Sequence, residues 1–145
     1  MRKLLLPLCG VALLCGVGAA RADALDDQVT AAYAAWNTAF NKGDASGIAS
    51  FYTDDAKLLP PDHNIYEGPA GVEKFFTAVL GNGLHDHALE LIDAESSGDY
   101  VIAAAKWSAK GKDASGAETT FGGIVTHVFE KQPDGSLKLE LMTFN

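Results

Sequence analysis

One apolar stripe near the start of the chain limits the possible folds more than any other feature. Its side chains recur at steps of three and four, which places them along one face of a helix: Leu25, Val29, Tyr33, Trp36 and Phe40. Asp23 or Asp26 suits the cap at the start of this helix, and Gly43 suits its left-handed end. Asp44 then caps a short second helix. The N-terminal part is therefore predicted to be helical and to need a partner surface for the stripe.

The chain turns sharply after this helical part. A strand of about four residues is expected over residues 56–59, and Pro60-Pro61 stops it because proline cannot continue a ladder of hydrogen bonds. Gly68-Pro69 opens a third helix, with proline in the first turn, where no amide donor is missed. Gly81-Asn82-Gly83 ends that helix. Its inward-facing residues are expected to be Val72, Phe75, Phe76, Val79 and Leu80.

The C-terminal half is typical of an antiparallel meander. Four strands are predicted, separated by turn residues: 85–96, 100–110, 117–130 and 136–144. Gly122-Gly123 indicates a bulge or bend within the third of them, which a strongly curved sheet requires. Helices followed by strands predict an α+β domain, a cone-shaped curved antiparallel sheet with three N-terminal-half helices packed on its concave face. An apolar pocket between the two layers would be the place for function.

The first residues are typical of a secretory signal peptide. A basic start, an apolar run too short to span a bilayer and a small-residue site at Ala20-Arg21-Ala22 predict cleavage after Ala22. The expected organisation is thus a signal peptide over 1–22 and one domain over 23–145, exported to the periplasm or secreted. Lipidation at Cys9 or Cys15 is the alternative, disfavoured by the bulky leucine before each cysteine.

The charge of the chain excludes several classes of partner. The sequence holds 11 basic and 19 acidic residues, and loss of the leader leaves eight lysines, no arginine and a net charge of about −11. Such a surface repels nucleic acid and anionic lipid, so neither nucleic acid nor, after signal cleavage, a membrane is expected as partner. Because the mature chain has no arginine, it lacks the guanidinium that binds carboxylate or phosphate in a bidentate way. An apolar, neutral or cationic ligand is therefore favoured over an anionic one. No cofactor is expected, because no phosphate-binding loop opens a helix.

Several short motifs follow one another along the chain. They are Asn41-Lys42-Gly43-Asp44, Phe51-Tyr52-Thr53-Asp54-Asp55-Ala56, Gly68-Pro69, Phe75-Phe76, Gly98-Asp99, Lys106-Trp107 and Asp134-Gly135. In this order the chain resembles the nuclear transport factor 2-like superfamily, and within it the SnoaL-like and DUF4440 exported proteins. The resemblance covers nearly all of residues 23–145. It implies a cone (a cystatin-like roll) with a pocket, usually dimeric, that hosts isomerases, cyclases, dehydratases and pure binding proteins.

The ketosteroid isomerase branch of that superfamily implies specific catalytic positions, and this chain departs from them. Pro60 stands where the carboxylate base is expected, Trp36 where a helix tyrosine is expected, and Thr126 where an acid is expected. Proline has no group that accepts a proton, so isomerase chemistry by that route is disfavoured. Polyketide-cyclase relatives often use a carboxylate at the position of Thr126, so that route is weakened as well.

Two histidines are the candidates for chemistry. His85 and His87 are predicted to share the apolar strand face with Leu89 and Leu91, because side chains alternate along a strand. A general acid or base role is assigned to His87; a metal site is not predicted, because the spacing supplies no further ligands. His127 alternates with apolar neighbours and is interpreted as a core histidine. Asp54 and Asp55 are interpreted as turn-forming carboxylates rather than a catalytic pair.

The predicted ligand pocket combines aromatic residues with two polar ones: Trp36, Phe40, Tyr52, Tyr66, His87, Trp107 and Thr126. The leading hypothesis is an exported small-molecule-binding protein whose ligand is apolar or neutral. One alternative is a cofactor-free lyase, isomerase or hydrolase of the SnoaL-like type that uses His87. Another is a non-catalytic dimerisation or assembly module. A homodimer through the outer face of the sheet is expected in each case.

Overall fold

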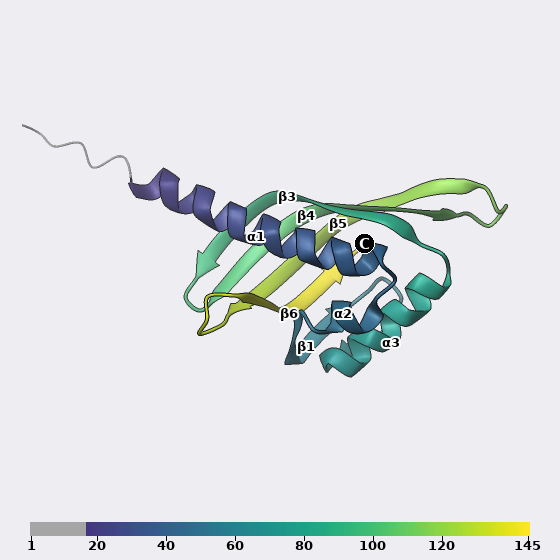
Figure 1. Cartoon of the computed structure of the whole chain (residues 1–145), viewed down its shortest axis with the longest axis horizontal. Coiled ribbons are helices and arrows are strands. Elements are labelled where there is room, and N and C mark those ends of the chain that lie inside the picture. Colours follow the sequence, from purple (N-terminus) through teal and green to yellow (C-terminus); the bar gives the residue numbers. More distant parts are fainter. Residues whose placement is uncertain (1–16) are drawn as a thin grey trace, which may run out of the picture.

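The computed structural model describes residues 17–145 (Figure 1). Among these described residues, three helices precede the long strands, namely α1 (Val17–Asn41), α2 (Ala45–Ala49) and α3 (Gly68–Gly81). Six strands form one sheet, namely β1 (Tyr52–Leu59), β2 (Tyr66–Glu67), β3 (His85–Ser97), β4 (Tyr100–Lys112), β5 (Glu118–Lys131) and β6 (Leu137–Phe144). The fold is α+β as predicted, with a curved sheet that does not close on itself.

The strands follow the order β2-β1-β6-β5-β4-β3 across the sheet. The four-stranded meander is antiparallel, as expected, but β1 pairs with β6 in parallel. The expected short strand over 56–59 was too short, because β1 begins at Tyr52. Ala56 and Leu58 are buried while Lys57 between them is exposed, so this strand has one core face. Asp54 and Asp55 are exposed on β1 and do not form the turn assigned to them.

Helix α1 lies across the face of the sheet that also receives α2 and α3, as Figure 1 shows. Its stripe is buried as predicted: Val29, Tyr33, Trp36 and Phe40 are in the core, and Leu25 packs at its edge. The helix starts before Asp23 and Asp26, so the cap expected at either residue was wrong. The predicted end was right, because Gly43 has a positive φ of 72°. Asp44 caps α2 by accepting a 2.8 Å hydrogen bond from the amide of Gly47.

No bulge lies at Gly122-Gly123, so that part of the prediction was wrong. The pairing of β4 with β5 runs without a shift through both glycines. The register shifts instead in β3, between His85 and Ala88 and again between Leu91 and Asp93. The glycines serve close packing: a Cβ at Gly123 would collide with the backbone oxygen of Asn145 and with the indole nitrogen of Trp107.

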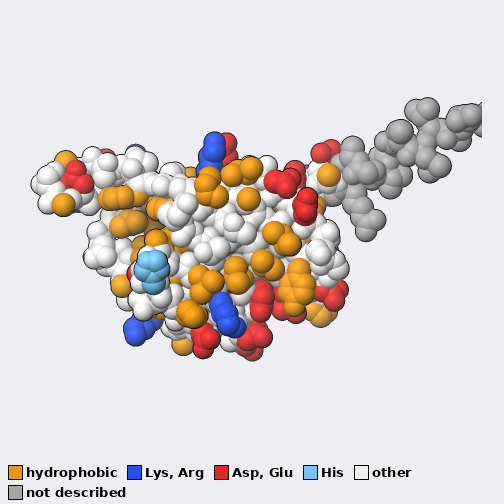
Figure 2. All heavy atoms as spheres, turned by 180° about the vertical axis from the view of Figure 1, so that it is seen from behind, with side chains coloured by type: hydrophobic (Ala, Val, Ile, Leu, Met, Phe, Trp, Pro, Cys, Tyr) orange, Lys and Arg blue, Asp and Glu red, His pale blue; other side chains and the backbone are white. Residues whose placement is uncertain are grey.

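The outer face of the sheet carries isolated apolar side chains. Ile102 and Ile124 alternate with buried residues of β4 and β5, so they point away from the helices and are exposed. Figure 2 views the molecule from behind, and hydrophobic side chains there are interspersed with charged ones. Among residues 17–145 no helix is both long enough and apolar enough to cross a membrane.

Candidate functional site

A cavity of about 110 Å³ lies between the helices and the sheet. Its lining comes from α1, from α3, from the start of β3 and the residue before it, from β4, and from the end of β6. The lining residues are Trp36, Phe40, Phe75, Phe76, Val79, Leu84, His87, Trp107, Met142 and Phe144. The concave sheet and the helix stripe therefore leave open space between them, and that space is almost wholly apolar.

The cavity has a buried floor and a half-buried rim. Trp36, Phe40 and Phe76 are buried and pack edge to face or stacked, with ring centroids 5.2–6.2 Å apart. Trp107 and Phe144 are only half-buried, and their rings meet edge to face at 5.8 Å. A small molecule can thus enter past the rim and reach a rigid aromatic floor.

A local distortion of β3 turns His87 into this cavity. Asp86 has a positive φ of 51°, and the register shifts between His85 and Ala88. His87 is consequently 8% exposed, whereas His85 faces solvent, where it lies 3.5 Å from the carboxylate of Asp86. The prediction that both histidines share the apolar face was wrong, because strict alternation does not survive a bulge.

Two asparagines of α1 hold His87 in place. The Asn41 side chain accepts a 2.7 Å hydrogen bond from the amide of His87 and donates a 2.9 Å bond to its carbonyl. The side-chain oxygen of Asn37 lies 2.8 Å from Nδ1 of the ring. Since this oxygen accepts, Nδ1 carries the proton, and Nε2 is left as a hydrogen-bond acceptor.

The surroundings of the His87 ring keep it neutral. Its centroid lies 4.8 Å from that of Trp36 and 4.6 Å from that of Phe40, and its plane is within 8° of parallel to Trp107. Burial among these rings lowers the pKa of His87 to about 4, because the apolar lining disfavours the charged imidazolium. At neutral pH the cavity therefore presents an uncharged acceptor and a weak base.

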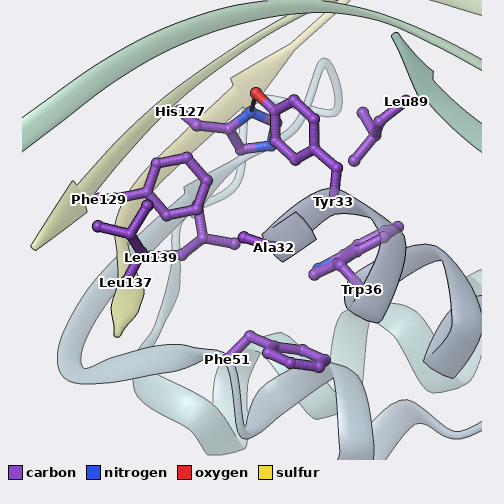
Figure 3. A pocket seen from close by; sticks show the side chains of 9 residues that line it. All are labelled: Ala32, Tyr33, Trp36, Phe51, Leu89, His127, Phe129, Leu137 and Leu139. Carbon is purple, nitrogen blue, oxygen red and sulfur yellow. Dashed lines mark hydrogen bonds between the residues drawn. The ribbon is translucent and has the colours of Figure 1, made fainter. Parts of the chain in front are cut away.

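The second buried imidazole is structural. The Tyr33 hydroxyl lies 2.9 Å from Nδ1 of His127, a pair shown in Figure 3. His127 is 1% exposed, and burial, reinforced by nearby His87, lowers its pKa to about 3. The hollow beside it is about 10 Å³, room for about one water molecule. His127 is confirmed as a core histidine.

The structure brings together four of the predicted pocket residues, namely Trp36, Phe40, His87 and Trp107, and places the other three elsewhere. Tyr52 is buried and its hydroxyl donates to the sulfur of Met142 at 3.0 Å. Tyr66 packs on Phe75 and donates to a carboxylate oxygen of Asp62 at 3.0 Å. Thr126 alternates with buried Val125 and His127, so it lies on the outer face.

The residues missed by the prediction lie on α3, before β3 and on β6. Phe75, Phe76 and Val79 were predicted to face inward but not to line the pocket. Leu84, Met142 and Phe144 carried no signal beyond their apolar character, because only the folded sheet places the end of β6 beside α1 and α3. Phe144 lies opposite Val125 in the antiparallel pairing of β5 with β6, and its place beside Trp107 of β4 emerges only in the folded sheet.

Few catalytic groups reach the cavity. No carboxylate is among its lining residues, and within residues 17–145 no group of three or more His, Cys, Asp or Glu is arranged to hold a metal ion. Pro60, at the position implied for an isomerase base, is buried directly after β1. The arrangement can bind a molecule and accept one hydrogen bond from it. Proton abstraction would depend on His87 alone.

Comparison with solved structures gives several neighbours of the same fold at low sequence identity. Aln2 from a Streptomyces species has a TM-score of 0.74 and 20% identity, covering 84% of this chain and 90% of that one. A nuclear transport factor 2 (NTF2-like) superfamily protein from Salmonella enterica serovar Typhimurium has a TM-score of 0.68 and 14% identity, covering 85% and 91%. A protein from Catenulispora acidiphila, solved in complex with S-DNPA, has a TM-score of 0.68 and 16% identity, covering 84% and 94%.

Family-level comparison is more specific. Comparison with the curated proteins gave no match. The family model described as the SnoaL-like domain matches residues 33–138, from the middle of α1 to the start of β6. The matched region includes Trp36, His87 and Trp107, which line the cavity. The chain belongs to the SnoaL-like family, and its fold is that of the NTF2-like proteins.

Proposed function

We propose that the protein is an exported binder of a small, largely apolar molecule, which it holds in the cavity around Trp36, His87 and Trp107. SnoaL-like folds commonly bind small molecules or act as cofactor-free isomerases or lyases. The single observation that favours binding is the lining itself, which offers an aromatic floor and one neutral acceptor but no carboxylate. The Catenulispora neighbour, solved with S-DNPA, supports a small-molecule role for this fold.

A thermal-shift screen with aromatic and aliphatic molecules tests the binding role. A ligand at one hundred times its Kd stabilises the folded state by about 2.7 kcal/mol, which raises Tm by roughly 10 °C for a chain of this size. Val79→Phe adds a ring at the rim and should abolish the shift. Ile65→Phe, at a position 63% exposed and away from the cavity, is the matched control. Equal shifts in both variants would place binding elsewhere.

Catalysis by His87 is the second candidate. A free Nε2 at the cavity wall can accept a proton, but a pKa of about 4 makes the ring a weak base at neutral pH. The discriminating variant is His87→Ala, with His85→Ala, on the same strand but exposed, as control. An enzyme loses turnover of a bound compound in the first variant alone. A binder shows no product with either variant or with the wild type, as followed by NMR.

Export is proposed from the leader over 1–22. Residues 1–16 lie outside the described residues, and the backbone of residues 17–22 forms the start of α1. Cleavage after Ala22 keeps the whole buried stripe, which begins at Leu25. N-terminal sequencing of protein recovered from the periplasm or medium should begin at Asp23. Protein that retains Met1 in the cytoplasm would contradict export.

A homodimer through the outer face of the sheet is also proposed. Ile92, Ile102 and Ile124 are exposed at 53%, 46% and 44%, on strands that run side by side. Pairing of two such faces would remove these side chains from water. Ile102→Lys should shift the sedimentation coefficient from dimer to monomer, while Ile65→Lys should leave it unchanged. A monomeric wild type would refute the proposal.

A further inference from the structure

The size of the cavity limits what it can bind. An apolar cavity of about 150 Å³ holds one benzene molecule, and the cavity here is about 110 Å³. A bicyclic ligand exceeds this space unless much of it stays outside the half-buried rim. The rings of His87 and Trp107 are nearly parallel with centroids 6.3 Å apart, too close for a third ring to stack between them, so a ligand ring lies beside them. The volume therefore favours one ring.

The polar atoms of the lining limit the ligand further. Trp107 Nε1 already donates to the backbone oxygen of Asn145 at 3.0 Å, and the Met142 sulfur already accepts from Tyr52. Trp36 Nε1 is fully enclosed without a partner. His87 Nε2 has no hydrogen bond within residues 17–145, yet it is not among the enclosed unpaired atoms, so it borders open space. The polar atom left for a ligand is thus an acceptor.

We propose that the cavity takes a single aromatic ring bearing a hydrogen-bond donor, of the phenol class, whose hydroxyl donates to Nε2 of His87. This inference rests on the proposed binding function and names its ligand class. Asn37 is the positioning residue, because its side-chain oxygen keeps the proton on Nδ1. An anionic ligand is disfavoured, since no cationic side chain lines the cavity.

The test is a thermodynamic cycle. The affinities of two probes of nearly equal shape, p-cresol and p-xylene, are measured for the wild type and for His87→Phe. The variant keeps a flat ring at the wall but removes the acceptor. In His87→Phe the hydroxyl of p-cresol is left unpaired in an apolar site. The affinity for p-cresol should therefore fall roughly tenfold or more relative to the affinity for p-xylene, as measured by titration calorimetry. In the wild type, p-cresol but not p-xylene should also move the ¹⁵N resonance of His87 Nε2, a readout that does not depend on the variant folding.

The outcomes separate the inference from the function on which it rests. If His87→Phe lowers the affinity for both probes equally, and p-cresol does not selectively move the ¹⁵N resonance of His87 Nε2 in the wild type, the proposed hydrogen bond is wrong. Binding in the cavity is then still supported. Tighter binding of 2-naphthol than of p-cresol overturns the limit to one ring. If none of the three probes perturbs resonances of the lining residues, the inference fails, and the parent function fails only if the thermal-shift screen with aliphatic molecules is negative as well.

Discussion

The two buried imidazoles should make the fold sensitive to mild acid. The pKa of His87 is about 4 and that of His127 about 3 in the folded state, against an ordinary value of 6.5. Between pH 6.5 and pH 4 the unfolded chain therefore binds protons that the folded chain excludes. This contribution to stability is fully present above about pH 6.5 and is lost as the pH falls toward the folded values.

The size of the effect follows from the two shifts. One pKa unit corresponds to 1.36 kcal/mol, so each histidine removes about 3 kcal/mol between pH 7 and pH 4. Together they remove about 6 kcal/mol, which is comparable with the whole stability of many domains. Carboxylates such as Asp113, whose pKa is lowered by its hydrogen bond with Ser115 and by backbone amides, titrate lower and add to the loss only near pH 4 and below.

Urea unfolding at several pH values between 7 and 4.5 measures this loss. Below pH 6 the free energy of unfolding should fall by up to about 1.4 kcal/mol per pH unit for each buried histidine. His127→Gln should flatten the slope by that amount, beyond any change caused by His85→Gln, the exposed control on β3. Identical slopes in wild type, His127→Gln and His87→Gln would refute the reasoning, because the imidazoles would then titrate as they do in the unfolded chain.

Three further variants probe the contacts that hold the site. Tyr33→Phe removes the partner of His127 Nδ1 and should lower the free energy of unfolding in urea by about 1–3 kcal/mol, whereas Tyr100→Phe at an exposed site should change little. Asn41→Ala leaves the His87 amide unpaired and should cost a similar amount, with Thr38→Ala on the exposed side of α1 as control. Gly123→Ala should displace Asn145 and move the NMR signal of the Trp107 indole N–H, with a loss of about 1–3 kcal/mol, while Gly81→Ala, with open space around it, should do neither. An unchanged stability in any first-named variant would contradict the contact it removes.

The sequence predicted the elements better than their assembly. The stripe from Leu25 to Phe40, the left-handed Gly43 and the meander all rest on local patterns, and each was confirmed. The parallel pairing of β1 with β6 joins segments far apart in the chain, and no local pattern encodes it. Met142 and Phe144 of β6 were missed because they reach the cavity only when the sheet brings the end of β6 beside the helices.

The candidate site shows the same division. Trp36, Phe40 and Trp107 were assigned to the pocket from apolar periodicity, which a regular helix or strand preserves. Thr126 was assigned from its alignment with a family position, and the structure places it on the opposite face. Alternation along β5 with buried Val125 already favoured that face, so local geometry was the better guide where the two disagreed.

The distortion at Asp86 decides what the cavity can do chemically. In a regular strand His85 and His87 would both face the helices, and two imidazoles could share a proton or a metal ion. The left-handed Asp86 turns one ring out to the carboxylates of Asp86 and Glu118, and leaves the other alone among aromatic rings. Because the asparagine pair of α1 then fixes both the backbone and the tautomer of His87, the site keeps one oriented acceptor in an apolar surrounding. Such a site discriminates among ligands by a single donor group, and it does so without a charge of its own.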